Sequence, residues 1–126
     1  MTRQPVTSPQ APAAIGPYSQ AVWCGDILYC SGQTPIVPAT GKLVEGDIAQ
    51  QTRQAFENLR QVLAAAGLGM EQVIKCNVYL VDMADFSGMN AEYQAQFTAP
   101  YPARTTVAVH QLPLGARVEI ELVARK

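Results

Sequence analysis

The sequence contains little charge, and the charge that it has is balanced. Nine Lys and Arg residues stand against ten Asp and Glu residues, charged residues make up 15% of the chain, and the formal net charge is -1. The basic residues form no run along the chain. Proteins that bind DNA or RNA use clusters of Lys and Arg to contact the phosphate backbone, so we expect no nucleic-acid partner.

Long apolar runs are missing as well. No stretch approaches the roughly 20 consecutive apolar residues that a membrane-spanning helix requires. Residues 1–14 are rich in proline and polar side chains and lack the apolar segment of a secretory signal. We therefore expect a soluble, cytoplasmic protein without a membrane partner.

Histidine and cysteine are scarce, and this argues against a metal site. The single histidine, His110, cannot build a histidine-rich centre, and the three cysteines do not have metal-binding spacing. Cys30 and Cys76 fall within apolar strand patterns, where a reduced thiol packs as a small hydrophobic group. We expect both to be buried thiols and the protein to hold no metal.

What is present is enough apolar sequence for one core. The 126 residues, 48% of them hydrophobic, predict a single domain over residues 1–126, with residues 1–14 as a partly ordered N-terminal arm. The hydrophobic patterns predict the element order β-β-α-β-α-β-β, an α+β domain with one mixed sheet and both helices on one face. The predicted elements are a hairpin of Tyr18–Cys24 and Ile27–Ser31, a loop over Thr34–Gly46 with room for a short strand, a helix capped by Asp47, a strand over Gln72–Val81, a helix from near Asp85 to before Pro100, and two final strands.

The two final strands carry the most informative charges. If they pair as an antiparallel hairpin, Val107, Val109, Val118 and Ile120 face the core. Arg104 and Thr106 then share the opposite face with Glu119 and Glu121. On a solvated face this is an ordinary ion pair, whereas on a covered face it is a candidate site for a small charged ligand. Tyr29 is among the aromatic and apolar residues expected on that face, which predicts cover by other subunits of a homo-oligomer.

Five short motifs resemble the Rid family of reactive enamine and imine deaminases. They are, in chain order, Ala13-Ala14-Ile15-Gly16-Pro17-Tyr18-Ser19-Gln20, Ser31-Gly32-Gln33, Asn90 with Tyr93, Pro102-Ala103-Arg104, and Val118-Glu119-Ile120-Glu121. Each motif alone is weak, but together they extend over nearly the whole chain. The resemblance implies a chorismate-mutase-like fold, assembly as a homotrimer with sites at the subunit interfaces, and chemistry without a metal or cofactor.

The resemblance also implies an activity. Members of the family hydrolyse 2-aminoacrylate, 2-iminopropanoate and 2-iminobutanoate to 2-oxo acids and ammonia, so the partners are small imino and enamino acids released by pyridoxal-phosphate enzymes. Arg104 matches the arginine that binds the substrate carboxylate, a task suited to a planar guanidinium. Glu119 matches the glutamate beside the attacking water.

Further residues match the family's pocket. Tyr18 and Ser31 correspond to side chains that hydrogen-bond the substrate, and the backbone of Gly32 lines the same cleft. Asn90 also falls at a motif position, where a structural role in the second helix fits equally well.

One position departs from the family. The archetypal deaminases carry a cysteine two residues after the arginine, and this chain has Thr106 there. We expect Thr106 to contact the substrate carboxylate through its backbone N–H, which a threonine supplies as well as a cysteine does.

Two alternatives to an enzyme stay open. A trimer that binds 2-oxo acids or other carboxylates without turnover, acting as a sensor, needs Arg104 but has little use for Glu119. An interaction protein needs neither residue. The presence of both favours the deaminase.

Overall fold

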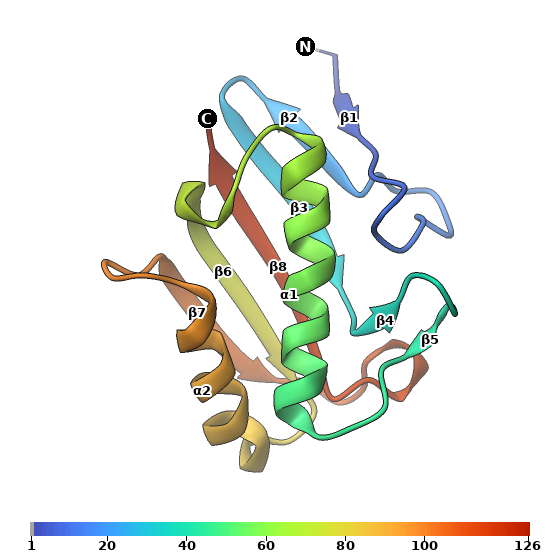
Figure 1. The fold of residues 1–126 in the computed structure, drawn as a ribbon, viewed down its shortest axis with the longest axis vertical. Helices are drawn as coiled ribbons and strands as arrows, with labels where there is room; N and C mark the ends of the chain where they lie inside the picture. Colours follow the sequence, from blue (N-terminus) through green and yellow to red (C-terminus); the bar gives the residue numbers. More distant parts are fainter. Residues whose placement is uncertain (1) are drawn as a thin grey trace.

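Six strands form one mixed sheet in the computed structural model, which describes residues 2–126 (Figure 1). Their order across the sheet is β1-β2-β3-β8-β6-β7, and each neighbouring pair is antiparallel except β6 and β7, which are parallel. The strands are β1 (Gln4–Val6), β2 (Ala21–Cys24), β3 (Ile27–Gln33), β6 (Val73–Leu80), β7 (Ala103–Ala108) and β8 (Val118–Arg125). The predicted α+β class and the mixed sheet are confirmed.

The first helix, α1 (Ile48–Ala65), begins as predicted at Asp47. The Asp47 carboxylate accepts a hydrogen bond from the backbone N–H of Gln50 at 3.0 Å, and the side-chain oxygen of Gln50 accepts one from the N–H of Asp47 at 2.8 Å. This capping box satisfies two donors that the first turn of a helix otherwise leaves unpaired. Beyond the last turn, Gly67 adopts a φ of +77°, a conformation that favours glycine.

Both helices lie on one face of the sheet, and aromatic rings join them (Figure 1). Phe56 of α1 stands edge-on to Tyr93 of α2 (Phe86–Gln96) and to Phe97, with ring centroids 5.5 and 5.7 Å apart. Met89 and Tyr93 are buried, so this side of α2 packs into the core. From the sheet the core receives alternate residues of the central strands, including Leu28, Cys76, Val78, Val118 and Ile120.

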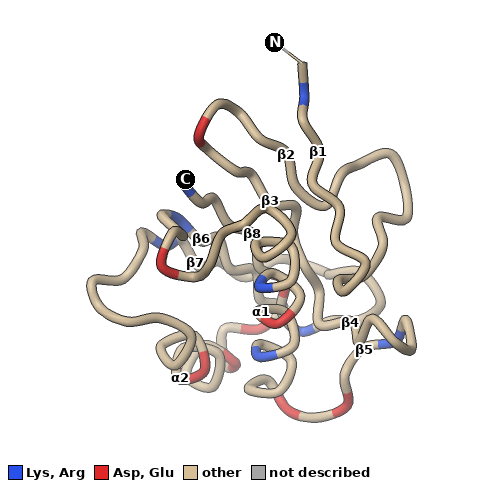
Figure 2. The backbone as a smooth tube through the Cα atoms, turned by 45° about the horizontal axis from the view of Figure 1, so that its top comes forward, with Lys and Arg blue, Asp and Glu red and all other residues tan. Residues whose placement is uncertain are grey.

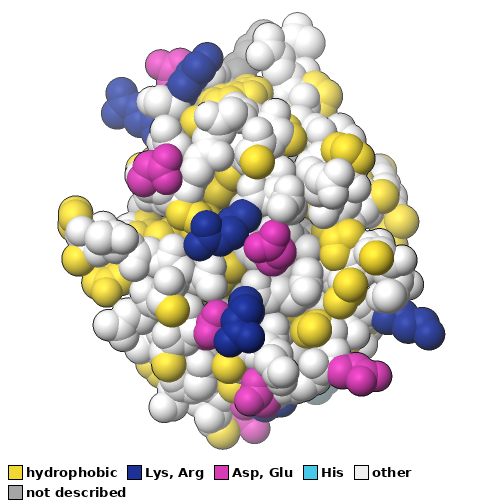
Figure 3. Space-filling view, viewed as in Figure 1, with side chains coloured by type: hydrophobic (Ala, Val, Ile, Leu, Met, Phe, Trp, Pro, Cys, Tyr) yellow, Lys and Arg dark blue, Asp and Glu magenta, His cyan; other side chains and the backbone are white. Residues whose placement is uncertain are grey.

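Charged side chains of both signs are spread along the chain (Figure 2) and adjoin one another on the helix-covered face (Figure 3). Arg53 of α1 forms an ion pair with Glu92 of α2, with 2.9 Å between Nε and Oε1. Arg117 and Asp85 form a second pair. Within residues 2–126, no helix has both the length and the apolarity needed to span a membrane.

Short strands appear where the sequence pattern predicts an arm and a loop. In the N-terminal arm, β1 pairs with β2 and places Val6 in the core. In the predicted loop, β4 (Ile36–Val37) and β5 (Lys42–Leu43) form a two-stranded hairpin apart from the main sheet. These strands of two or three residues are too short to show an alternating pattern.

The predicted pairing of the last two strands is wrong. β7 is the edge strand and pairs in parallel with β6, whereas β8 lies between β3 and β6. Arg104 is aligned with buried Cys76 and therefore lies on the helix-covered face, while Glu119 is aligned with Tyr79 on the opposite face. Arg104 and Glu119 of one chain do not share a face.

The wrong prediction of the strand pairing has a simple physical reason. Alternation of apolar and polar residues fixes which residues of one strand share a face, and this part of the prediction for β8 holds, because Val118 and Ile120 are fully buried. It does not fix which strand is the neighbour. The segment after β7, with the short 3-10 helix η3 (Pro113–Gly115), crosses over β6 instead of closing a hairpin. Val107, expected in the core, is 41% exposed.

Candidate functional site

The predicted site residues lie in two separate groups on one protomer. The first group, the arginine cluster, consists of Arg104 on β7 and the α2 residues Phe86, Asn90 and Tyr93. The second, the glutamate pocket, is a cavity of about 350 Å³ that is lined by Glu119, Tyr18 and Gly32 among others. Of the predicted site residues, Arg104 and Asn90 lie in the arginine cluster, and Glu119, Tyr18 and Gly32 lie in the glutamate pocket.

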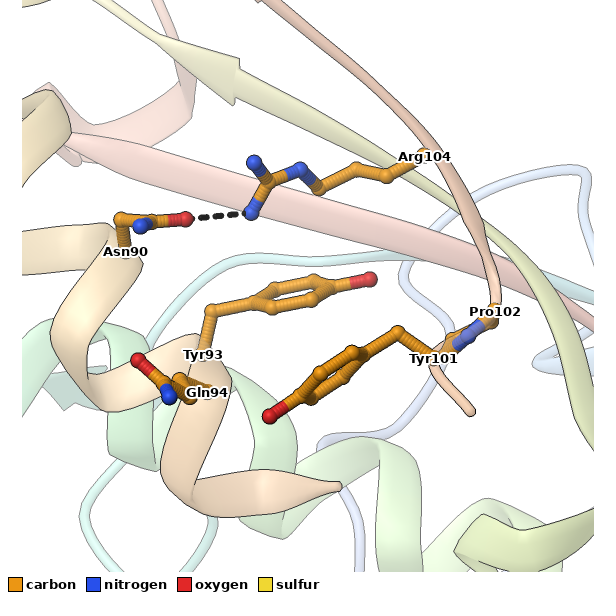
Figure 4. A pocket seen from close by; sticks show the side chains of 6 residues that line it. All are labelled: Asn90, Tyr93, Gln94, Tyr101, Pro102 and Arg104. Carbon is orange, nitrogen blue, oxygen red and sulfur yellow. Dashed lines mark hydrogen bonds between the residues drawn. The ribbon is translucent and has the colours of Figure 1, made fainter. Parts of the chain in front are cut away.

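The arginine cluster holds the guanidinium of Arg104 in a fixed position. Nη1 donates a hydrogen bond to Oδ1 of Asn90 at 2.7 Å, and Cζ lies 4.6 Å from the ring centroid of Tyr93 and 5.5 Å from that of Phe86 (Figure 4). Aromatic rings attract a guanidinium through the negative potential of their faces. One donor is used by Asn90, and the guanidinium has further N–H groups for a bidentate acceptor such as a carboxylate.

A cavity of about 430 Å³ opens beside this guanidinium. Arg104 reaches toward it from β7, and α2 supplies the opposite side (Figure 4). The lining residues are Asn90, Tyr93, Gln94, Tyr101, Pro102 and Arg104. Tyr101 is 49% exposed at the mouth, so a small ligand can reach the arginine from solvent.

Thr106 follows Arg104 on the same face of β7, where it is aligned with the buried Val78 of β6. Its hydroxyl oxygen is buried and has no hydrogen-bond partner among the described residues. A buried hydroxyl without a partner carries a desolvation cost, which a bound water or a ligand oxygen removes.

The two cysteines predicted to be buried thiols are buried. Burial, with a smaller effect of nearby Cys76, raises the pKa of Cys30 to about 12, and burial raises the pKa of Cys76 to about 11. Both thiols therefore remain protonated and unreactive at neutral pH. Within residues 2–126, no three His, Cys, Asp or Glu side chains lie together in a way that suits a metal ion.

The glutamate pocket lies on the other face of the sheet, where β3 is irregular. The register between β3 and β8 shifts between Cys30 and Gln33, so Ser31 and Gly32 lie in a bulge. A Cβ atom added to Gly32 would lie 2.5 Å from Oε2 of Glu119, which shows that the carboxylate packs directly against the Gly32 backbone. The bulge and the glycine make room for the carboxylate.

Tyr18 lines the glutamate pocket, whereas Ser31 does not. Tyr18 lines the cavity and is 51% exposed. Ser31 donates its hydroxyl to the carbonyl of Ser19 at 2.6 Å, and its N–H donates to the carbonyl of Gln20 at 2.9 Å. In this structure the Ser31 side chain therefore anchors the segment that carries Tyr18.

The charges around Glu119 favour its protonated form. Burial, followed by the negative charge of Glu121, raises the pKa of Glu119. Glu121 in turn accepts a short hydrogen bond from the Tyr79 hydroxyl, and mainly this bond raises the pKa of Tyr79 to about 12. A carboxyl group with a raised pKa is suited both to accept a proton and to return it.

Part of the pocket wall was not predicted from the sequence. The remaining lining residues come from the N-terminal arm, the end of β3, β4 and the η3 turn: Pro12, Ala13, Ile15, Gln33, Thr34, Ile36, Pro113 and Leu114. Ala13, Ile15 and Gln33 belong to the motifs that resemble the Rid family, whereas no pattern in the sequence marks the other five as pocket residues. An exposed leucine in a Pro-Leu-Gly turn is the one signal that points to a special role for η3.

Comparisons with known proteins agree over nearly the full chain. The endoribonuclease L-PSP family matches residues 8–126. Protein DfrA of Myxococcus xanthus is 47% identical, with 98% of this chain and 96% of that protein covered. The 2-iminobutanoate/2-iminopropanoate deaminase of Bos taurus is 44% identical over 98% of this chain and 90% of its own. Among solved structures, the Rid-family protein YyfA of Yersinia pestis has a TM-score of 0.96 at 44% identity, with 99% of this chain and 100% of that chain covered.

Proposed function

Because the chain belongs to the endoribonuclease L-PSP family, which matches residues 8–126, we propose that it hydrolyses 2-imino acids and their enamine tautomers to 2-oxo acids and ammonia. The observation that carries this proposal is the arginine cluster. Arg104 is fixed by Asn90 and by two rings and still has donors for a carboxylate, which every 2-imino acid carries. The substrates expected first are 2-iminopropanoate, 2-iminobutanoate and 2-aminoacrylate.

The chemistry requires little from the protein. The carbon of a protonated imine is strongly electrophilic, so placing the substrate and one water is the main task. Arg104 binds the carboxylate, and Glu119 accepts a proton as water adds to the carbon of the C=N bond. The resulting carbinolamine carries a hydroxyl and an amino group on one carbon. Glu119 returns the proton to nitrogen, the C–N bond breaks, and the hydroxyl proton passes to the departing ammonia, leaving a 2-oxo acid and an ammonium ion.

An enamine substrate must first isomerise to the imine. Its terminal carbon gains a proton, the double bond shifts to nitrogen, and the imine then reacts with water as above. The raised pKa of Glu119, caused mainly by burial, supports a role in these proton transfers because the carboxyl group readily holds a proton.

The complete site is proposed to form between two subunits of a homotrimer. In one protomer Arg104 lies on the helix-covered face of edge strand β7, and Glu119 lies on the opposite face of β8, with β6 between them. One chain therefore cannot apply both side chains to one small substrate. Tyr29, 55% exposed on the open face, supports cover by a neighbouring subunit.

The other predicted residues have roles that fit this arrangement. Asn90 orients Arg104, and the backbone N–H of Thr106 is proposed to bind the same carboxylate. Tyr18 is proposed to hydrogen-bond the substrate from the glutamate pocket, where Gly32 provides close backbone approach and Ser31 holds the adjoining segment. No step uses a cofactor.

RNA is a less suitable substrate than a small imino acid, whatever the family's description suggests. The chain has nine basic and ten acidic residues, whereas a protein that cleaves RNA needs a basic surface for the phosphates. We place the proposed activity in the cytoplasm, next to pyridoxal-phosphate enzymes that release the reactive imines.

The test generates 2-aminoacrylate in situ with a serine or cysteine lyase and follows the decay of imine absorbance. The wild type should accelerate the decay. Arg104→Ala should lose about 100-fold or more, because two charge-assisted hydrogen bonds to the carboxylate disappear. Glu119→Gln should lose about 100-fold or more through the missing base. Arg60→Ala removes an exposed arginine that bonds only Gln96, and it serves as the matched control that keeps activity.

Two results would contradict the proposal. Equal decay rates with wild type and Arg104→Ala would exclude Arg104 as the carboxylate ligand. No acceleration by the wild type, together with measurable binding of pyruvate, would instead identify a carboxylate-binding protein without turnover.

A further inference from the structure

The glutamate pocket has an apolar wall for which the proposed chemistry has no use. Ile15 is 83% exposed and Leu114 is 65% exposed, the highest fractions among the large exposed hydrophobic side chains of the described residues. Both line the cavity of about 350 Å³ that Glu119 also lines, and half-buried Ile36 joins them. Exposed apolar side chains gathered around a reactive carboxylate indicate a surface that a ligand covers.

The backbone at Leu114 supports this interpretation. Its φ is +60° and its ψ is 15°, and it is the one non-glycine residue with a positive φ in the described chain. Left-handed backbone is unfavourable for leucine, and such residues gather at ligand-binding sites, where the surroundings hold them in place. The turn therefore keeps a leucine at the cavity wall in a conformation that glycine or asparagine would adopt at lower cost.

Two buried amide side chains fix the remainder of the wall. Gln20 accepts from the N–H of Ser8 at 2.6 Å and donates to the carbonyl of Pro12 at 2.8 Å, which fixes the arm that leads to Ile15. On the other side, Asn58 of α1 donates to the carbonyls of Thr34 at 3.2 Å and Ile36 at 2.8 Å. The wall is therefore held by the fold at both sides of the cavity.

We infer that Ile15, Ile36 and Leu114 form a subsite for the substrate side chain, so that the enzyme prefers 2-imino acids with aliphatic side chains of three or four carbons. The inference rests on the proposed deaminase function and names the selectivity of the same site. One protomer contributes a cavity of about 350 Å³ to the proposed interface site, and the three aliphatic side chains in its wall offer more apolar surface than a methyl group covers. In an apolar pocket one methylene group changes kcat/KM by about 10-fold or more.

The experiment compares two substrates in one assay. An amino-acid oxidase generates imines from alanine and from leucine, and imine decay gives kcat/KM for each with wild type and variants. Leu114→Asn removes the apolar surface and tolerates the left-handed backbone, whereas Leu114→Met keeps an apolar side chain. Met83→Ala is the matched control, because Met83 is 48% exposed and does not line this cavity.

The subsite predicts a change in the ratio of the two kcat/KM values. The leucine-derived imine has three more side-chain carbons than the alanine-derived imine, so the wild type should favour it by about 100-fold or more, and Leu114→Asn should lower this preference by about 10-fold or more. Leu114→Met and Met83→Ala should keep it. If Leu114→Asn leaves the ratio of the two kcat/KM values unchanged, even with an equal loss of activity toward both imines, the inference is overturned.

A binding measurement separates this inference from the proposed function. Calorimetry with 4-methyl-2-oxopentanoate and with pyruvate requires no turnover. If the wild type hydrolyses neither imine, the proposed function fails, but tighter binding of 4-methyl-2-oxopentanoate that Leu114→Asn abolishes still supports the subsite. Equal affinities for the two 2-oxo acids would refute the subsite while leaving hydrolysis unaffected.

Discussion

The guanidinium of Arg104 lies over the ring of Tyr93, with 4.6 Å between Cζ and the ring centroid, and Asn90 accepts its Nη1 donor. Arg104 belongs to β7, but the residues that hold its guanidinium belong to α2, so both elements form the site. Tyr93 also contacts Phe56 and Phe97 in the core, so the position of the cation is tied to the packing of the helix on the sheet.

Substitutions of Tyr93 should separate its ring from its hydroxyl. Tyr93→Phe keeps the ring face and should keep KM within about twofold. Tyr93→Leu removes the cation–π contact and should raise KM by about 5-fold to 20-fold with a smaller effect on kcat, because the contact is worth roughly 0.5 to 2 kcal/mol. Steady-state kinetics with 2-iminopropanoate would measure this, and thermal unfolding would identify any loss of core stability.

A substitution of Asn90 tests the positioning of Arg104 independently of Tyr93. Asn90→Leu removes the acceptor for Nη1 and should raise KM in the same direction as Tyr93→Leu. If Tyr93→Phe and Tyr93→Leu had the same KM, the ring would contribute only to folding and not to the position of Arg104.

Gly32 leaves room for the Glu119 carboxylate, the proposed base. In Gly32→Ala the new Cβ would lie 2.5 Å from Oε2 of Glu119, so the carboxylate must move. We expect kcat to fall by about 10-fold to 100-fold, because misplacing a catalytic group by about 1 Å costs that much. The melting temperature should change little, since Glu119 has a flexible side chain that moves at low cost. A wild-type kcat in Gly32→Ala would show that Glu119 need not occupy its present position.

The raised pKa of Glu119 predicts how activity depends on pH. In the proposed mechanism Glu119 must be ionised to accept a proton from water. We therefore expect kcat/KM to rise with pH through the pKa of Glu119, which lies above the usual value for glutamate. Glu121→Gln removes a neighbouring negative charge and should move this acidic limb to lower pH. The amide oxygen of a glutamine at this position can still accept from the Tyr79 hydroxyl, although the bond loses its charge assistance. Tyr79→Phe removes this bond and keeps the charge of Glu121, so it is the control and should leave the limb closer to its wild-type position.

The raised pKa of Glu119 also predicts how the stability of the fold depends on pH. A carboxyl group whose folded pKa is raised binds its proton more tightly in the folded state, so its stabilising effect is complete at low pH and is lost as pH rises through the folded pKa. Glu119→Gln should therefore be more stable than the wild type at neutral pH, and the difference should disappear in acid. Urea denaturation at pH 4 and pH 7 would test this, and a larger gain at pH 4 would contradict it.

Local patterns in the sequence predicted local features of the structure. Asp47 caps α1 as expected, and Cys24 pairs with Ile27 in the first hairpin. Alternation in β8 correctly assigned Val118 and Ile120 to the core. Each of these features depends on residues close together in the chain, so a short pattern is sufficient to define them.

The relation between Arg104 and Glu119 was not predictable in the same way. It depends on which strands are neighbours, and β7 and β8 follow one another in sequence without pairing. The motifs that resemble the Rid family identified both residues but did not show that they lie on opposite faces of one chain. The resemblance did imply sites between subunits, which is the arrangement that the observed topology favours.

Mixed trimers should therefore recover activity from two inactive variants. Arg104→Ala retains Glu119, and Glu119→Gln retains Arg104, so an interface that takes Arg104 from the second variant and Glu119 from the first is complete. Each mixed trimer contains one complete interface out of three, so it should have about a third of wild-type activity. Co-expression with two different purification tags and assay of the doubly tagged trimers would measure this. Activity no higher than that of either parent would mean that the site is not shared between subunits, and Arg104 would then bind its carboxylate without help from Glu119.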